Sequence, residues 1–183
     1  MPLPNKAVNR SILAGIRRMA DRIGSLGWHV EIHVDVREMQ DVEAFFSDYP
    51  VSVVIEHMGH MPTSRGIEAP GFKSLLRFIS GGIGWVKLSG PYINSVLPPP
   101  YADVRPFVEA QVAAAPSKAV WGTNWPHPHR NPIPDDRLLC NLVWDWFSTA
   151  ELRQRILVDN PARLYDFEQI RECVLKNNET YCA

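Results

Sequence analysis

The chain contains the run Val51-Ser52-Val53-Val54-Ile55, followed directly by Glu56-His57-Met58-Gly59-His60. The first five residues are mostly apolar and β-branched, which predicts a buried strand. The polar residues that follow lie where this strand ends. Such a pattern is typical of a parallel β/α fold, in which functional side chains gather at the carboxyl ends of the strands.

A second stretch towards the end of the chain has the same form. The apolar residues Ala119 to Trp121 are followed by Gly122-Thr123-Asn124-Trp125-Pro126-His127-Pro128. The two stretches together predict an α/β enzyme whose catalytic groups sit at strand ends.

Helical and strand periodicity alternate along the chain. Amphipathic spacing predicts a first helix over residues 8–26, which Gly27 can end. The expected strands are residues 29–34, 51–55, 85–88 and 119–121, and the expected later helices are residues 36–47, 71–80, 101–115, 135–147 and 149–158, with a last turn at 160–164. Strands that alternate with helices imply a parallel sheet built from right-handed crossover units.

Such a sheet is either an open doubly wound sheet or part of a barrel. Four strands cannot close a barrel, and an eight-stranded β/α barrel typically needs about 250 residues, whereas this chain has 183. The chain also starts on a helix, which would follow a strand in a complete barrel. We therefore interpret residues 1–167 as the C-terminal half, about four strands, of a TIM-type barrel, and residues 168–183 as a polar tail.

The composition excludes several classes of partner. The 19 basic and 20 acidic side chains leave a formal charge of −1, which favours neither nucleic acid nor an anionic membrane. Cys140, Cys173 and Cys182 form an odd set without CxxC spacing, which fits a reducing compartment. Neither a signal-type N-terminus nor an apolar run of about 18 residues is visible. We therefore expect a cytoplasmic protein that acts on a small molecule.

The expected strand ends carry side chains suited to hydrolysis. They are His33, Asp35, Glu56, His57, His60, Lys87, Ser89, Thr123, Asn124 and His127. An imidazole with a free pKa of about 6.5 can act as base, acid or metal ligand near neutral pH. His57 is the strongest candidate because Gly59 lets the loop turn tightly beside it. Gly59 and Pro62 argue against a helix there, so we expect only His57, and not His60, to point into the site.

Other motifs are weaker. His127-Pro128-His129 mimics a His-x-His metal pair, but side-chain alternation is not assured in a proline-rich loop. Ser89 has no Gly-x-Ser-x-Gly elbow, which argues against a serine hydrolase. The glycines between residues 81 and 84 precede a strand, unlike those of a phosphate-binding loop. Lys87 could serve the site, point outward, or be neutralised inside the sheet.

Several segments, taken in order, resemble the amidohydrolase-related family. They are residues 29–35 (HVEIHVD), 55–59 (IEHMG), 85–92 (WVKLSGPY), 120–128 (VWGTNWPHP) and 157–165 (LVDNPARLY). The nearest branch is the lactonases that act on 2-pyrone-4,6-dicarboxylate and similar intermediates of aromatic degradation. The resemblance implies a distorted barrel of the metal-dependent hydrolase type, with strands five to eight present here. It also implies hydrolysis of a lactone or amide bond in a small carboxylated compound.

The resemblance implies roles for individual residues. His57 matches the sixth-strand histidine, a catalytic group and possible metal ligand, and His33 lies at the end of the fifth strand. His33, Ser89, Tyr92 and His127 would contact the substrate. Zinc is common in the superfamily, whereas the lactonase branch can work without metal, so the resemblance leaves the cofactor open.

Asn124 stands where the family has an aspartate that ends the eighth strand. An aspartate there would accept a proton from the attacking water or bind a metal, but a neutral amide cannot take that proton. Ile93 replaces an arginine suited to grip a substrate carboxylate. The family's first-strand His-x-His pair lies outside this chain.

Two hypotheses follow. In the first, the chain is a hydrolase in which His57 polarises the carbonyl or holds a metal while Asn124 orients the water. In the second, it is a catalytically impaired or non-catalytic remnant, such as a binding subunit. In either case half a barrel exposes sheet edges, which favours self-association.

Overall fold

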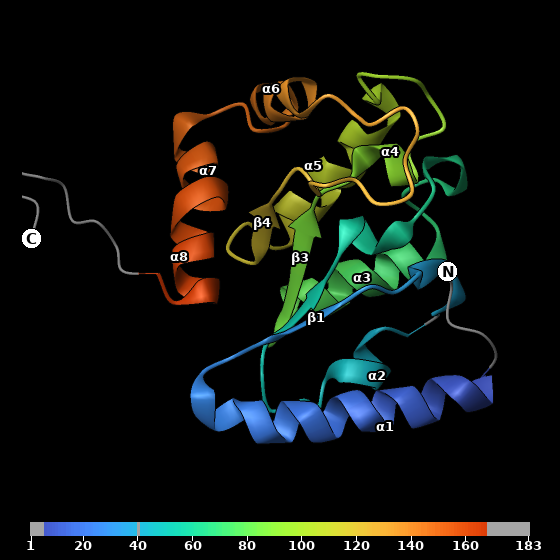
Figure 1. Ribbon diagram of the computed structural model, residues 1–183, viewed down its shortest axis with the longest axis vertical. Coiled ribbons are helices and arrows are strands. Elements are labelled where there is room, and N and C mark those ends of the chain that lie inside the picture. Colours follow the sequence, from blue (N-terminus) through green and yellow to red (C-terminus); the bar gives the residue numbers. More distant parts are fainter. Residues whose placement is uncertain (1–5, 40, 168–183) are drawn as a thin grey trace, which may run out of the picture.

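A computed structural model describes residues 6–39 and 41–167 of the chain (Figure 1). Its four strands, β1 (Val30–Ile32), β2 (Val53–Ile55), β3 (Gly84–Leu88) and β4 (Ala119–Trp121), form one sheet in the order β1-β2-β3-β4. Every neighbouring pair is parallel. The prediction of a parallel α/β fold with about four strands is therefore confirmed, and the predicted tail at 168–183 lies outside the described residues.

A helix and a turn precede β1, and further helices and turns follow each strand. They are α1 (Lys6–Ile23), η1 (Gly24–Leu26), η2 (Val36–Glu38), α2 (Glu43–Phe46), η3 (His57–His60), η4 (Thr63–Arg65), α3 (Pro70–Ser80), α4 (Pro91–Asn94), η5 (Ala102–Val104), α5 (Arg105–Ala114), α6 (Asp136–Trp146), α7 (Ala150–Gln154), the π-helical turn η6 (Arg155–Asp159) and α8 (Asn160–Tyr165). No helix among the described residues has both the length and the apolar character needed to cross a bilayer.

One expected helix is broken. Residues 36–47 were expected to form a single helix, but they form the short η2 and the four-residue α2 instead. The Asp35 side chain caps η2 by accepting the Arg37 backbone N–H at 3.0 Å, and Met39 then turns to an extended conformation. Val36 is fully buried. Burial of Val36 in the core and the cap from Asp35 outweigh the helical periodicity of this segment.

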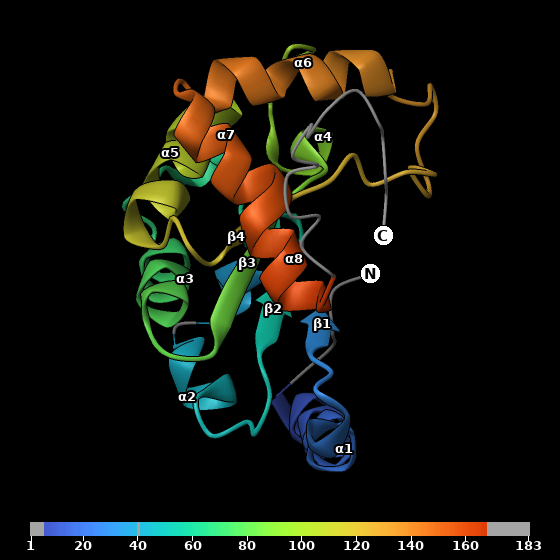
Figure 2. The same ribbon diagram turned by 90° about the vertical axis from the view of Figure 1, so that its left-hand side faces the viewer.

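The two faces of the sheet are covered by different helices (Figure 2). Side chains alternate along each strand, so Val53 and Ile55 of β2 join α3 and α5 in the main core. Val54 points the other way and packs with Trp85 of β3 and Leu164 of α8. The sheet is thereby held between helices, and its carboxyl edge is left to the loops that carry the polar residues.

Neighbouring strands end at nearly the same level. The Glu56 N–H donates to the Ile32 carbonyl at 3.1 Å, and the Gly122 N–H donates to the Leu88 carbonyl at 3.4 Å. The residues that follow each strand are therefore brought to one edge of the sheet, as the parallel arrangement predicts.

Gly71 gives a direct test of how α3 packs on η2. A Cβ at Gly71 would lie 2.0 Å from the Val36 carbonyl oxygen, a clash with backbone. We expect Gly71→Ala to lower the free energy of unfolding by about 1–3 kcal/mol or more, as overpacking does, in chemical denaturation. At Gly82 a Cβ would meet nothing within 4 Å, so Gly82→Ala should change stability by only about 0.5 kcal/mol. Equal effects would contradict this packing.

The outer strands of the sheet generate a second prediction. Among the described residues β1 and β4 each pair on one side only, and unpaired strand edges template further pairing. On β4 the Asn160 side chain covers one such group by donating to the Ala119 carbonyl at 2.7 Å. We expect the chain to self-associate as its concentration rises, measured by light scattering. A monodisperse monomer over the whole concentration range would refute this.

Candidate active site

The loop after β2 has an unusual backbone. His57, Met58, Gly59 and His60 all have positive φ, between 51° and 74°, a region that costs free energy for residues other than glycine. The loop is held by its surroundings: Asn94 donates to the His57 carbonyl at 3.2 Å, and Met58 is buried. Strain of this kind persists only where packing imposes it, and it is common at functional sites.

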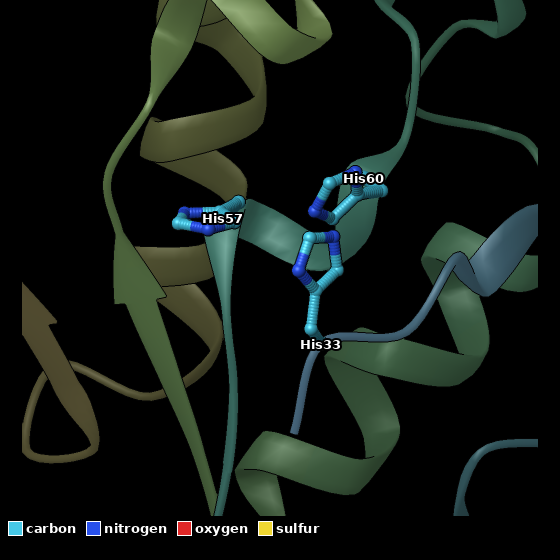
Figure 3. A group of neighbouring side chains, drawn as sticks. All are labelled: His33, His57 and His60. Carbon is cyan, nitrogen blue, oxygen red and sulfur yellow. The ribbon is translucent and has the colours of Figure 1, made fainter. Parts of the chain in front are cut away.

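This backbone brings three histidines together (Figure 3). The ring of His33 stacks on that of His60 with centroids 4.0 Å apart, and it lies 5.3 Å from the ring of His57 in an edge-on arrangement. One ring nitrogen from each residue lies within 4.8 Å of the others. The expectation that His60 would point away from the site is therefore wrong. That expectation rested on the absence of a regular helix. The left-handed backbone from His57 to His60 instead brings the His60 ring within 5.3 Å of the His57 ring.

The surroundings keep two of these imidazoles neutral. Burial, followed by the nearby His33, lowers the pKa of His57 to about 4 and that of His60 to about 3. Near pH 7 both rings therefore carry a lone pair. The Nε2 atom of His60 is buried and has no hydrogen-bond partner. Three neighbouring imidazoles, one of which has a buried nitrogen without a partner, suit a divalent metal such as zinc.

Ser89 fixes the ring of His57. It follows β3, is 1% exposed, and its Oγ lies 2.8 Å from His57 Nδ1. The sequence placed Ser89 among residues that touch the substrate, whereas its contact in the structure is with His57. This contact restricts the orientation of the imidazole, as hydrogen-bonded partners of functional histidines commonly do.

Lys87 is neutralised within the sheet. Its ammonium pairs with the carboxylate of Glu31 on β1 and lies 3.5 Å from Glu56 Oε1. Burial would lower the pKa of Lys87, but Glu31 raises it on balance. Of the readings that the sequence left open, the structure supports neutralisation inside the sheet. The other Glu56 oxygen lies 3.8 Å from His57 Nε2, so this ion pair borders the histidine cluster.

A second polar group follows β4. The Asn124 amide donates through Nδ2 to the Tyr92 hydroxyl at 2.8 Å, and that hydroxyl lies 2.8 Å from His127 Nδ1. His127 Nε2 in turn lies 3.1 Å from Asp136 Oδ1. The His127 side chain is fully buried. Both of its ring nitrogens have protein partners, Tyr92 at Nδ1 and Asp136 at Nε2.

Some predicted residues do not take part. His129 is exposed while His127 is buried, so the His-x-His motif forms no ligand pair. Sequence reasoning missed Asp136, because it lies in the first turn of α6 and reads as an ordinary helix start. Its spacing of nine residues from His127 gave no signal, since the proline-rich loop between them has no regular period.

The short helix α4 connects the two groups. Tyr92 reaches Asn124, while Asn94 on the same helix donates to the His57 carbonyl. A Cβ at Gly90 would lie 3.4 Å from Asn124 Nδ2, which places the backbone beside Ser89 against Asn124. Helix α4 and the adjoining Gly90 backbone therefore contact both the histidine cluster and the Asn124 group.

Comparison with known proteins supports a family assignment. A family model described as amidohydrolase matches residues 2–167. The chain is 37% identical to the 2-pyrone-4,6-dicarboxylate hydrolase of Comamonas testosteroni, over 85% of this chain and 54% of that protein. It is 34% identical to a 4-sulfomuconolactone hydrolase of Hydrogenophaga intermedia, over 81% of this chain and 50% of that protein.

A solved structure supports the same family assignment. The chain superimposes on a putative 2-pyrone-4,6-dicarboxylic acid hydrolase from Pseudomonas putida with a TM-score of 0.71 and 32% identity. The match covers 83% of this chain and 56% of that structure. The chain spans about half the length of the curated relatives it matches, in keeping with four strands of an eight-stranded barrel. It is a member of the amidohydrolase family that corresponds to half of the family's β/α barrel.

Proposed function

We propose that the chain hydrolyses the ester bond of a small carboxylated lactone, with His57 and Asn124 at the reacting centre. The observation that carries the proposal is the position of His57 at the end of β2, buried, neutral and oriented by Ser89. Two curated relatives that share 34–37% identity with the chain are named as hydrolases of such compounds.

His57 is assigned the task of polarising the carbonyl. If the Ser89 hydroxyl donates to Nδ1, the ring proton lies on Nε2 and can be donated to a carbonyl oxygen. His33 is the exposed member of the cluster, and we assign it to substrate contact, together with the ring of Tyr92. Ser89 and His127 are assigned to positioning, because both are buried against other side chains.

Asn124 is assigned to the attacking water. Its Nδ2 is committed to the Tyr92 hydroxyl, which leaves Oδ1 to accept a hydrogen bond from water. The amide can hold and orient that water, but it cannot remove its proton. The site therefore needs a base elsewhere.

The histidine cluster also suits a metal. His33, His57 and His60 would hold it through one nitrogen each, and the unpartnered Nε2 of His60 supports this assignment. A bound divalent ion such as zinc would polarise a carbonyl and lower the pKa of water. If His57 Nε2 bound zinc, the ring proton would lie on Nδ1. Nδ1 would then donate to the Ser89 hydroxyl.

The alternative is a catalytically impaired chain that retains ligand binding. The observations that favour it are the amide at Asn124 and the match to only half the length of the relatives. The two proposals differ in whether water is consumed at the site.

Zinc binding can be measured without any turnover. We expect the chain to bind one zinc ion in a competition titration with a chromophoric chelator. His60→Gln removes one of three ligands and should weaken binding by at least about tenfold, by comparison with the loss from disturbing metal-site partners. The control His129→Gln alters an exposed histidine outside the cluster. Equal affinity of His60→Gln and the native chain would rule out the three-histidine site.

Hydrolysis of 2-pyrone-4,6-dicarboxylate and a small lactone panel tests the proposed reaction. We expect turnover by the native chain, and a loss of about 10²- to 10⁴-fold for His57→Asn, the range for a positioned acid–base group. Arg105→Ala, on the exposed side of α5, should leave the rate unchanged. No turnover by either the native chain or Asn124→Asp would refute the proposal. Turnover by Asn124→Asp alone would favour the impaired chain.

A further inference from the structure

An unbroken line of hydrogen bonds runs from Asn124, after β4, to the start of α6. It joins Asn124, Tyr92, His127 and Asp136 through contacts of 2.8, 2.8 and 3.1 Å. These residues come from three parts of the chain, the loop after β4, α4 and α6. The line begins at Asn124, whose amide cannot act as a base, and ends at the carboxylate of Asp136.

The ends of this line fix the direction of every hydrogen bond in it. The Asn124 NH₂ group can only donate, so the Tyr92 oxygen accepts and its own hydrogen is left for His127 Nδ1. The Asp136 carboxylate can only accept, so a His127 ring with a single proton carries it on Nε2 and has its lone pair on Nδ1. The Tyr92 hydroxyl needs an acceptor at Nδ1 and the Asp136 carboxylate needs a donor at Nε2, and a single tautomer of His127 provides both. Tyr92 therefore donates to a nitrogen that is ready to accept a proton.

We propose that Tyr92, His127 and Asp136 form a proton relay that replaces the base lost at Asn124. This inference rests on the proposed function. When the water oxygen bonds to the lactone carbonyl carbon, the water proton passes to the Tyr92 oxygen and the Tyr92 proton passes to His127 Nδ1. His127 becomes an imidazolium beside the Asp136 carboxylate. The same path returns the proton to the leaving oxygen as the lactone C–O bond breaks, so the relay ends as it began.

In this relay Tyr92 is the catalytic residue, while His127 and Asp136 act through it as positioning residues. The arrangement resembles a hydrolytic triad, in which a carboxylate holds a histidine in the tautomer that accepts a proton from a hydroxyl. The shared feature is a nitrogen lone pair aimed at a hydroxyl.

The surroundings suit proton transfer. The charged and titratable groups around Tyr92 and His127 are Asp136, Arg130 and Tyr101. The Arg130 guanidinium lies 5.0 Å from the centre of the Tyr92 ring. The centre of the Tyr101 ring lies 6.3 Å from the same point. Burial raises the pKa of Tyr92, so the hydroxyl keeps its proton at rest. The His127 side chain is fully buried, whereas Asp136 is 43% exposed and Tyr92 is partly exposed, so a buried imidazole links a hydroxyl and a carboxylate that water can both reach.

The kinetic test uses the full chain and 2-pyrone-4,6-dicarboxylate over a range of pH. We expect Tyr92→Phe and Asp136→Asn each to lower kcat by about 10²- to 10⁴-fold with little change in KM. The matched control is Asp135→Asn. Asp135 caps the same helix by accepting the Arg137 N–H at 2.9 Å, and asparagine caps as well as aspartate does, so kcat should not change.

The decisive variant combines Tyr92→Phe with Asn124→Asp. A carboxylate at position 124 can take the water proton directly, so the double variant should recover most of the lost kcat and acquire a carboxylate-type acid limb in its pH profile. A purely structural role for Tyr92 would not be rescued in this way. Unimpaired kcat in Tyr92→Phe, or an impaired Tyr92→Phe that Asn124→Asp does not rescue, would overturn the relay while the proposed hydrolysis stands.

A second measurement needs no turnover. ¹⁵N NMR of the native chain should show His127 as the Nε2–H tautomer, and Asp136→Asn should shift its equilibrium towards Nδ1–H. The Nδ1–H tautomer in the native chain would overturn the relay. Activity that appears only with Asn124→Asp would also overturn it, because the native relay would then supply no base. Inactivity of both chains would instead overturn the proposed function itself.

Discussion

The parallel pairing of four short strands is the constraint on which the rest of the structure depends. Because β1 to β4 run in the same direction and end at similar levels, the residues after each strand meet at one edge. His33, His57, Ser89 and Asn124 come from four different strand ends. These residues are too far apart in the sequence for local interactions to bring them together. The parallel pairing of each strand with the next places them at one edge of the sheet.

Much of this arrangement was predictable from the sequence. The β-branched run before Glu56 and the apolar run before Gly122 marked buried strands, and the polar residues behind them marked the functional edge. The side-chain details were not predictable in the same way. His60 was misjudged because four consecutive positive φ angles, imposed by packing around Met58, have no signature in hydrophobic periodicity. Asp136 was missed because its contact with His127 arises from the path of a long loop.

The hydrogen bonds of Asn124 bear on the prediction that this amide stands where the resemblance implies an aspartate. An isolated amide in place of a carboxylate would leave the attacking water without a base. In this chain the amide is instead the first member of a hydrogen-bonded line that ends at a carboxylate. Orientation of the water and removal of its proton can then be assigned to different side chains, which is a division of roles that the sequence motif does not reveal.

The most direct test of hydrolysis at this site is a single turnover of 2-pyrone-4,6-dicarboxylate by the native chain in water enriched in ¹⁸O, with His57→Asn run in parallel. We expect one ¹⁸O atom in the newly formed carboxylate of the product, and a faster release of that product than with His57→Asn. A product formed without ¹⁸O, or at the same rate in both samples, would contradict the claim that this half of the barrel carries a hydrolytic site.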